Sequence, residues 1–119
     1  MFTLEEFLRT NDGDKYISCK NHEESKECTA VLQSAGKKWK FGDEYSDYDV
    51  YERRPGVENV IYSNDGGWDH DAQGFLYVET YGGDIVQWSV LAAEVGLRGD
   101  IECVNSDEIE FLFTGLEVV

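Results

Sequence analysis

Basic residues are scarce in this sequence, and their scarcity limits the partners that the protein can have. The 119 residues include 10 Lys and Arg against 25 Asp and Glu, which gives a net charge of −15 at pH 7. Beyond residue 54 the only basic residue is Arg98, against thirteen acids in the same half. Such a surface repels nucleic acid and anionic membranes and attracts basic surfaces. We therefore expect a partner protein with a basic surface, and neither direct nucleic-acid contact nor membrane binding.

Cysteines are few, and long apolar runs are missing. The three cysteines, Cys19, Cys28 and Cys103, form no CxxC pair, which favours reduced thiols in a cytosolic protein. No stretch approaches the roughly 18 apolar residues that a membrane helix needs. The first residues, Met1 to Glu6, lack the basic and apolar segments of a signal peptide. We therefore expect a cytoplasmic protein.

Residue patterns that carry catalysis are also missing. The sequence has no GxSxG motif, no P-loop and no GxGxxG motif. Cys19 and His22 lie close in sequence, but the nearby acids Glu23, Glu24 and Glu27 would destabilise a thiolate. We therefore expect no enzymatic activity and no cofactor.

The segment 69–74 is the one partial match to a metal motif. Its sequence, DHDAQG, resembles the start of a calcium loop, but the twelfth position, which requires a bidentate Glu, is Thr80. A solvated acidic turn explains the segment more simply. No Cys and His residues have the spacing of a zinc site. We predict no metal site, and a weak calcium site at 69–74 stays an open alternative.

Aromatic residues, in contrast, are abundant, and local structure signals are clear. Six Phe, seven Tyr and three Trp, in a sequence that is 41% hydrophobic, indicate one folded domain over residues 1–119. A capping box formed by Thr3 and Glu6, with Phe2 and Phe7 as a hydrophobic staple, predicts a short N-terminal helix.

The segment 15–41 carries the strongest signals and predicts a β-α-β unit. Residues 16–19 are typical of a short strand, and Asn21 is placed to cap a following helix. Gly36 is placed to end that helix. Residues 37–41 then predict a second strand, with Trp39 and Phe41 on one side and lysines on its solvent face. The apolar face of the helix is expected to consist of Cys28, Val31, Leu32 and Ala35.

The rest of the chain predicts four further strands and one ambiguous segment. Residues 42–56 are expected to form an exposed loop with about one helical turn. Residues 84–95 favour a helix that begins after Asp84 and ends at Gly96, although 84–91 also fits a strand. A turn is predicted at 64–67, and the predicted strands are 57–63, 75–80, 101–104 and 109–113.

These elements predict an α+β fold in a single compact domain. A roughly six-stranded, mostly antiparallel sheet is expected to pack against helices 22–35 and 84–95, with a short N-terminal helix beside them. The alternative is a mostly-β protein in which 84–91 is a strand.

Two segments resemble proteins of tailed phages. The segment 15–48, KYISCKNHEESKECTAVLQSAGKKWKFGDEYSDY, resembles a module of small acidic phage proteins of unknown function. The segment 83–113, GDIVQWSVLAAEVGLRGDIECVNSDEIEFLF, is similar to a phage-type helix followed by a hairpin. The resemblance implies a phage or mobile-element origin and location in the host cytoplasm. By analogy it implies an inhibitor of host defence, such as an anti-CRISPR protein or a DNA mimic, and it implies no catalytic residue.

We therefore expect a non-enzymatic inhibitor that binds a host nucleic-acid-handling protein, for example a CRISPR effector. Carboxylates on a rigid surface can imitate phosphates, and Tyr and Trp supply interface anchors. The candidate partner-binding residues are the acids and tyrosines of the segment 43–49 and the acids of the segment 65–71: Asp43, Glu44, Tyr45, Asp47, Tyr48, Asp49, Asp65, Asp69 and Asp71.

Other functions fit the same sequence. A structural or assembly protein could act as a homo-oligomer, for instance a homodimer, through exposed edges of strands 57–63 or 109–113. An immunity-type protein that neutralises a basic toxin would need the same acidic, aromatic face. The charge could also serve solubility alone.

Overall fold

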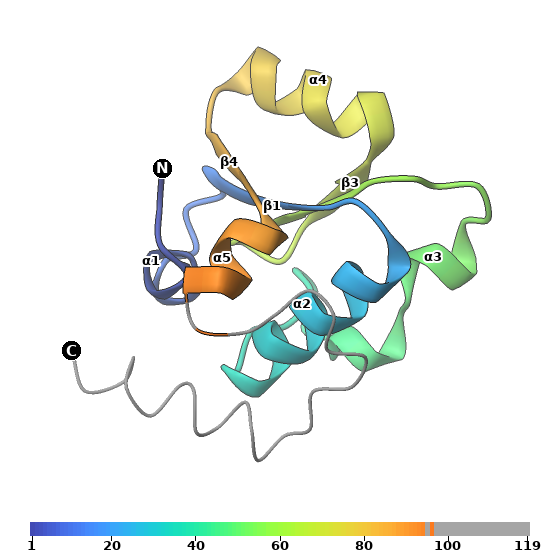
Figure 1. Cartoon of the computed structure of the whole chain (residues 1–119), viewed down its shortest axis with the longest axis horizontal. Helices are drawn as coiled ribbons and strands as arrows, with labels where there is room; N and C mark the ends of the chain where they lie inside the picture. Colours follow the sequence, from blue (N-terminus) through green and yellow to red (C-terminus); the bar gives the residue numbers. More distant parts are fainter. Residues whose placement is uncertain (95, 97–119) are drawn as a thin grey trace.

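A four-stranded mixed sheet forms the centre of the fold (Figure 1). Its strands are β1 (Lys15–Cys19), β2 (Val60–Ser63), β3 (Trp68–His70) and β4 (Asp84–Gln87), in the order β3-β2-β1-β4. Strand β2 pairs antiparallel with β1 and β3, whereas β4 pairs parallel with β1. The computed structural model describes residues 1–94 and 96.

Helices cover both faces of the sheet and give an α+β domain. Helices α1 (Leu4–Arg9), α2 (His22–Ser34) and α5 (Trp88–Glu94) enclose the main core on one face. Helix α4 (Asp71–Tyr81) lies against the other face, where Val78 contacts Tyr16 and Ile61 (Figure 1). The strands serve both cores because neighbouring side chains alternate between faces: Ile17 points to the main core and Tyr16 to the smaller one.

The predicted N-terminal helix is confirmed as α1. Thr3 is its N-cap, and its hydroxyl oxygen accepts a hydrogen bond from the Glu6 backbone N–H at 3.2 Å. The rings of Phe2 and Phe7 stack with centroids 5.8 Å apart, as a hydrophobic staple requires. Both rings are buried, so α1 is attached to the main core.

The predicted helix after β1 is confirmed as α2. The Asn21 side chain accepts a hydrogen bond from the Glu24 N–H at 2.8 Å, and Gly36 follows the helix with a φ of 86°. Cys28, Val31 and Leu32 of the predicted apolar face are buried. Ala35 is exposed, because the helix ends at Ser34.

The strand predicted at 37–41 is wrong, and with it the β-α-β unit as placed. Lys38 and Lys40 are exposed, as expected for the solvent face, but Lys37 is buried, with 8% of its surface exposed. Its ammonium donates hydrogen bonds to the carbonyl oxygens of Thr10 and Asn64 and to the side chain of Asn11. These contacts hold the segment across the end of the sheet. The parallel partner of β1 is β4, which lies much later in the sequence.

The strand predicted at 75–80 is also wrong, because these residues belong to α4. Apolar residues alternate there as in a strand, but only Gly74 and Val78, four residues apart, are buried. Strand β2 is already paired on both sides, with β1 and with the short strand β3. The turn predicted at 64–67 is confirmed, and it joins β2 to β3.

Both interpretations of residues 84–95 hold in part. The first four residues form β4, where Ile85 and Val86 suit a strand, and the chain then continues directly into α5. Trp88 and Ala92 are buried as the helical pattern predicts. Gly96 has a φ of 82°, in agreement with a helix stop.

Within the described residues the sheet is mostly antiparallel, as expected, since two of its three strand pairings are antiparallel and the β1–β4 pairing is parallel. Four strands are present in the part of the chain that the structure describes, and the strands predicted at 101–104 and 109–113 lie outside it. The prediction that the strand at 57–63 offers an exposed edge to a second copy is wrong, because β2 is an interior strand of the sheet. No helix within 1–94 and 96 has both the length and the apolar character needed to cross a membrane.

The acidic segment 42–56 is more ordered and more buried than an exposed loop. It contains the 3-10 helix η1 (Tyr45–Asp47) and the short helix α3 (Val50–Arg53). Tyr45 and Val50 belong to the main core. The segment contacts α2, and Ser46 N–H donates to the Gln33 side chain at 2.8 Å.

Candidate functional site

A fixed turn presents one aromatic side chain to solvent. The Trp39 N–H donates to the Asp43 carbonyl oxygen at 2.8 Å, and the Gly42 N–H donates to the Trp39 carbonyl oxygen at 2.8 Å. The Lys40 N–H donates to the Gly66 carbonyl oxygen at 3.0 Å, which attaches the turn to the β2–β3 hairpin. Phe41, at the tip, is 93% exposed. We call residues 39–43 the Phe41 turn.

An open groove of about 440 Å³ lies beside the Phe41 turn, and we call it the aromatic groove. The Tyr48 ring lies 6.2 Å from Trp39 and 5.9 Å from Trp68, measured between centroids. The guanidinium groups of Arg53 and Arg54 lie over the rings of Tyr48 and Trp68, at 5.5 and 5.7 Å. The residues that line the groove are Trp39, Lys40, Phe41, Asp43, Tyr48, Gly66, Gly67 and Trp68.

A second cavity, of about 230 Å³, lies between the sheet and α4. Its lining combines the apolar side chains of Tyr16 and Ile61 with the carboxylates of Asp65 and Asp69. Lys40 lines both this cavity and the aromatic groove, and its ammonium lies 3.6 Å from the Asp65 carboxylate. The aromatic groove and this cavity are therefore adjacent, with Lys40 between them.

The predicted residues of the segment 43–49 have different surroundings. Asp43 is exposed at the groove, and its carboxylate has no hydrogen-bond or ion-pair partner within the described residues. The Asp47 carboxylate accepts the Glu44 N–H at 3.2 Å, and Glu44 lies 3.7 Å from the Lys38 ammonium. Tyr45 is buried, so it supports the fold rather than offering a surface.

The two remaining predicted residues of that segment also differ. Tyr48 is half-buried and lines the aromatic groove. Asp49 points away from the groove toward His22, whose Nε2 lies 2.7 Å from the Asp49 carboxylate. Of the seven positions 43–49, Asp43 and Tyr48 therefore belong to the groove.

The acids of the segment 65–71 do not join this surface. Asp65 and Asp69 line the cavity under α4 instead. The Asp71 carboxylate accepts the backbone N–H groups of Asn59 and Glu58, at 2.9 and 3.0 Å. These bonds, the one from Asn59 first, lower the pKa of Asp71 below its usual value.

The calcium pattern at 69–74 does not form a calcium loop. Residues 69 and 70 end β3, and residues 71–74 begin α4. One Asp71 oxygen accepts the backbone N–H of Asn59, just before β2, and one Asp69 oxygen accepts the His70 N–H at 2.8 Å. Both oxygens are therefore already used within the fold. A different group of possible metal ligands consists of His22, Asp49 and Glu52. No local motif could reveal it, because His22 and Asp49 lie 27 positions apart.

The cysteine closest to a histidine in sequence is not an activated nucleophile. Cys19 is fully buried, and burial raises the pKa of its thiol well above the ordinary value. Contact with the Cys28 side chain raises this pKa further.

Two residues of this surface, Phe41 and Trp68, were not predicted from the sequence. Phe41 was placed on the buried side of a strand, and Trp68 was assigned to no element. The signal for the turn is the Gly-Asp pair after Phe41, which favours a turn over a continuing strand. Trp68 follows the predicted hairpin turn directly, so it could have been placed on the returning strand.

No protein-family model, curated protein or solved structure matches this chain. The resemblance to phage proteins therefore stays a prediction.

Proposed function

We propose that this protein is a non-enzymatic inhibitor that binds a partner with a basic, nucleic-acid-handling surface. The observation that carries the proposal is Phe41, which is 93% exposed on a turn held by three backbone hydrogen bonds. Exposure of a whole aromatic side chain on a fixed turn has no benefit for the isolated fold. The same side chain suits an anchor that becomes buried in a partner.

A fixed turn makes such an anchor efficient. Ordering a flexible loop on binding costs conformational entropy, and a turn that is already ordered avoids most of this cost. Full burial of a Phe side chain contributes about 1.5–3 kcal/mol. The aromatic groove beside the turn adds apolar surface for the neighbouring part of the partner.

The charge of the chain favours a basic partner. A net charge of −15 accelerates association with a positive surface and slows association with acidic proteins. Asp43, at the rim of the groove, is available for a partner Lys or Arg. A partner that uses its basic surface for nucleic acid would then lose access to that ligand.

The test is a capture experiment with competition by DNA. The protein is immobilised and exposed to a lysate of bacteria that carry a CRISPR system, and bound proteins are eluted with duplex DNA or with rising NaCl. We expect one partner that both eluents release. Phe41→Ser should lower its recovery about tenfold, since 1.4 kcal/mol corresponds to a factor of ten. The ring is exposed, so folding should not change.

Leu76→Ser is the matched control. Leu76 is 61% exposed on α4, outside the Phe41 turn and its groove. Recovery should be unchanged in this variant. Recovery that is insensitive to Phe41→Ser, or a partner that DNA does not release, would contradict the proposal. A captured secreted toxin in place of a nucleic-acid-handling protein would favour the immunity-type function.

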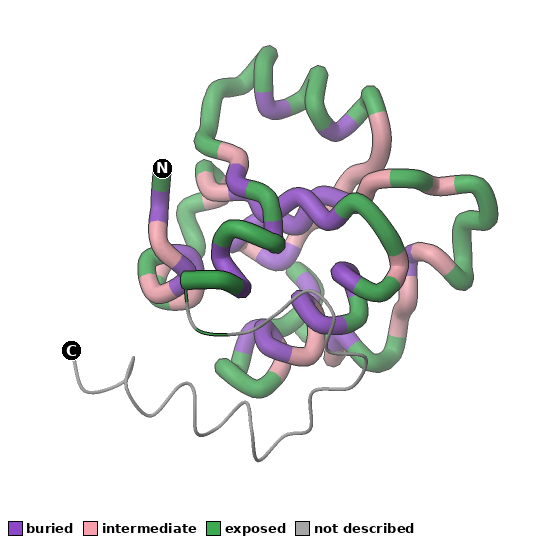
Figure 2. The backbone as a smooth tube through the Cα atoms, viewed as in Figure 1, coloured by how far each residue is buried: buried purple, intermediate pink, exposed green. Residues whose placement is uncertain are grey.

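A homo-oligomer is the second candidate, and α4 favours it. Most of α4 is exposed (Figure 2), including four apolar side chains: Phe75, Leu76, Tyr77 and Tyr81. Such a face is suited to contact a second copy. Light scattering at micromolar concentration would then give a dimer mass that Leu76→Ser reduces to that of a monomer.

A further inference from the structure

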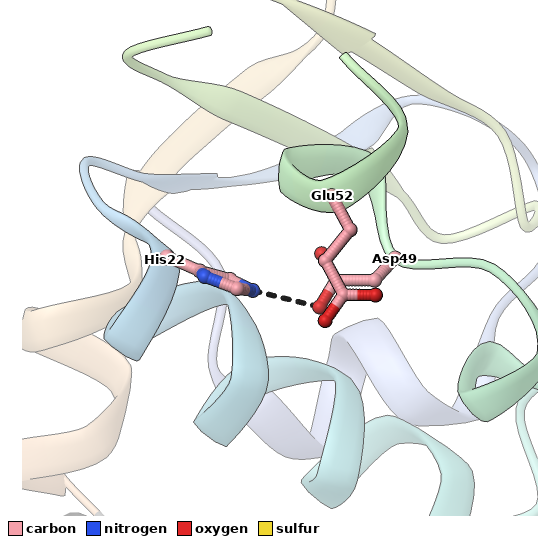
Figure 3. Close-up of side chains that lie close together, drawn as sticks. All are labelled: His22, Asp49 and Glu52. Atoms are coloured by element: carbon pink, nitrogen blue, oxygen red, sulfur yellow. Dashed lines mark hydrogen bonds and ion pairs between the residues drawn. The ribbon is translucent and has the colours of Figure 1, made fainter. Parts of the chain in front are cut away.

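Three possible metal ligands from two distant segments meet at one point on the surface (Figure 3). His22 is the first residue of α2, Asp49 is the N-cap of α3, and Glu52 lies within α3. One ligand atom from each lies within 4.8 Å of the others. Within residues 1–94 and 96, no second group of three His, Cys or acidic side chains meets this condition.

The fold orients His22 and Asp49 and places Glu52 beside them. One Asp49 oxygen accepts the Tyr51 N–H at 3.0 Å, and the other lies 2.7 Å from His22 Nε2. A spacing of three residues puts Glu52 on the same side of α3 as Asp49. The Tyr51 ring stacks on the His22 imidazole with centroids 5.1 Å apart. The Tyr51 hydroxyl is itself held by the Glu58 carbonyl oxygen at 2.8 Å.

We propose that His22, Asp49 and Glu52 bind a divalent transition-metal ion, with Zn²⁺ as the best fit. A neutral imidazole and two carboxylates carry a charge of about −2, which balances a divalent cation. The imidazole nitrogen selects against Ca²⁺ and Mg²⁺, which prefer oxygen ligands. One nitrogen and two carboxylate oxygens are a donor set that zinc accepts in proteins.

The spacing of the ligand atoms suits zinc after a small adjustment. Bonds of about 2.0–2.1 Å in tetrahedral geometry place ligand atoms about 3.3 Å apart. The His22–Asp49 pair is already closer than this, at 2.7 Å. Glu52 is exposed, so its side chain is free to move inward. Three protein ligands leave a fourth position for water or for a group of a partner.

The bound ion would connect α3 to the start of α2. The hydrogen-bonded contact between His22 and Asp49 would be replaced by two bonds to the metal. Zinc would therefore stabilise the start of α3, where Asp49 directly follows Tyr48 of the aromatic groove. This site does not depend on the proposed inhibitor function.

The second histidine provides an internal control. His70 Nδ1 lies 3.3 Å from an Asp71 oxygen, so it too has an acidic neighbour. The other Asp71 oxygen is occupied by two backbone N–H groups, and no third possible ligand lies close to this pair among residues 1–94 and 96. His70→Gln should therefore leave zinc binding unchanged.

The test is a Zn²⁺ titration by calorimetry, with Cys103→Ser as the background to remove a competing thiol. We expect one ion per chain. Glu52→Gln, a change at an exposed residue, should weaken binding by about tenfold or more, as loss of a ligand does, and His22→Gln should do the same. Equal affinity in Glu52→Gln, His22→Gln and His70→Gln would overturn the proposal, as would the absence of binding.

A second readout locates the ion independently of affinity. In ¹⁵N spectra of the histidine rings, saturating Zn²⁺ should shift the Nε2 resonance of His22 and leave both nitrogens of His70 unchanged. A shift at His70 alone, or at both rings equally, would contradict the site.

Discussion

Asn64 shows how a single side chain joins distant parts of this chain. It is fully buried in the turn after β2. Its side-chain oxygen accepts the N–H groups of Gly13 and Lys15, at 3.0 and 3.4 Å. Its amide nitrogen donates to Asp12 at 2.7 Å and to the Thr10 hydroxyl at 2.9 Å. Four bonds therefore fix the segment before β1 against the β2–β3 hairpin.

Asn64→Ala should lower the free energy of unfolding by about 2–4 kcal/mol, because the half-buried N–H groups of Gly13 and Lys15 would lose their partners. Asn59→Ala is the matched control. Asn59 is half-buried, and it donates its hydrogen bond from the backbone N–H, which the alanine variant keeps. Urea denaturation at pH 7 measures both variants. Equal unfolding midpoints for Asn64→Ala and the wild type would show that these bonds do not stabilise the fold.

Asp71 should make part of the stability depend on pH. Its pKa is lowered in the folded state, so the folded state favours the ionised form. The stabilisation is present above the unfolded value of about 3.8 and is lost as pH falls through the lower folded value. Asp71→Asn keeps an acceptor oxygen and suits the φ of 50° at this position. Between pH 5 and pH 3 the variant should lose less stability than the wild type. Parallel losses in thermal melts would contradict this assignment.

Residues whose partners are close in sequence were predictable, and residues with distant partners were not. The caps at Thr3 and Asn21 bond to groups three positions away, so the sequence pattern contains both members. Asn64 and Lys37 bond to groups about 25–55 positions away, and no local pattern contains those pairs. Phe41 was misplaced because alternation with lysines does not distinguish a strand from a turn.

At the scale of elements, the same distinction separates the correct predictions from the errors. Helix α2 carries its own start and stop signals and was predicted nearly to the residue. Whether the segments of β4 and α4 form a strand or a helix depends on which of them pairs with the sheet. Alternation of apolar and polar residues alone does not decide this. The group of His22, Asp49 and Glu52 was missed for the same reason, since it needs α2 and α3 side by side.

Gly66→Ala should detach the Phe41 turn from the hairpin. A Cβ atom at Gly66 would lie 2.6 Å from the Lys38 carbonyl oxygen and 2.6 Å from the Lys40 nitrogen. Gly56 has almost the same φ, 92° against 91°, but no atom lies within 4 Å of its Cβ position. Gly56→Ala should therefore lower the free energy of unfolding by about 1–2 kcal/mol, because of its positive φ alone. Gly66→Ala should lower it clearly more, because the added Cβ would also clash with the Phe41 turn. Equal thermal stability of the two variants would contradict the close packing of this turn.

At the scale of the whole molecule, the net charge of −15 opposes folding by self-repulsion. Salt screens this repulsion, with a Debye length of about 10 Å at 0.1 M and about 3 Å at 1 M. The melting temperature should therefore rise with NaCl, whereas binding to a basic partner should weaken. A melting temperature that falls with NaCl would show that attractive ion pairs, rather than repulsion, dominate the electrostatics of the fold.

Photo-crosslinking at position 41 tests the proposed binding surface most directly. Phe41 is replaced by the photoreactive analogue p-benzoylphenylalanine, which the exposed turn accommodates, and Leu76 is replaced in the same way as the control. After irradiation in bacterial cells, we expect one dominant crosslinked protein from position 41, with nucleic-acid-binding function, and none of that product from position 76. Absence of any crosslink at position 41, or the same products from both positions, would contradict a partner-binding role for the Phe41 turn.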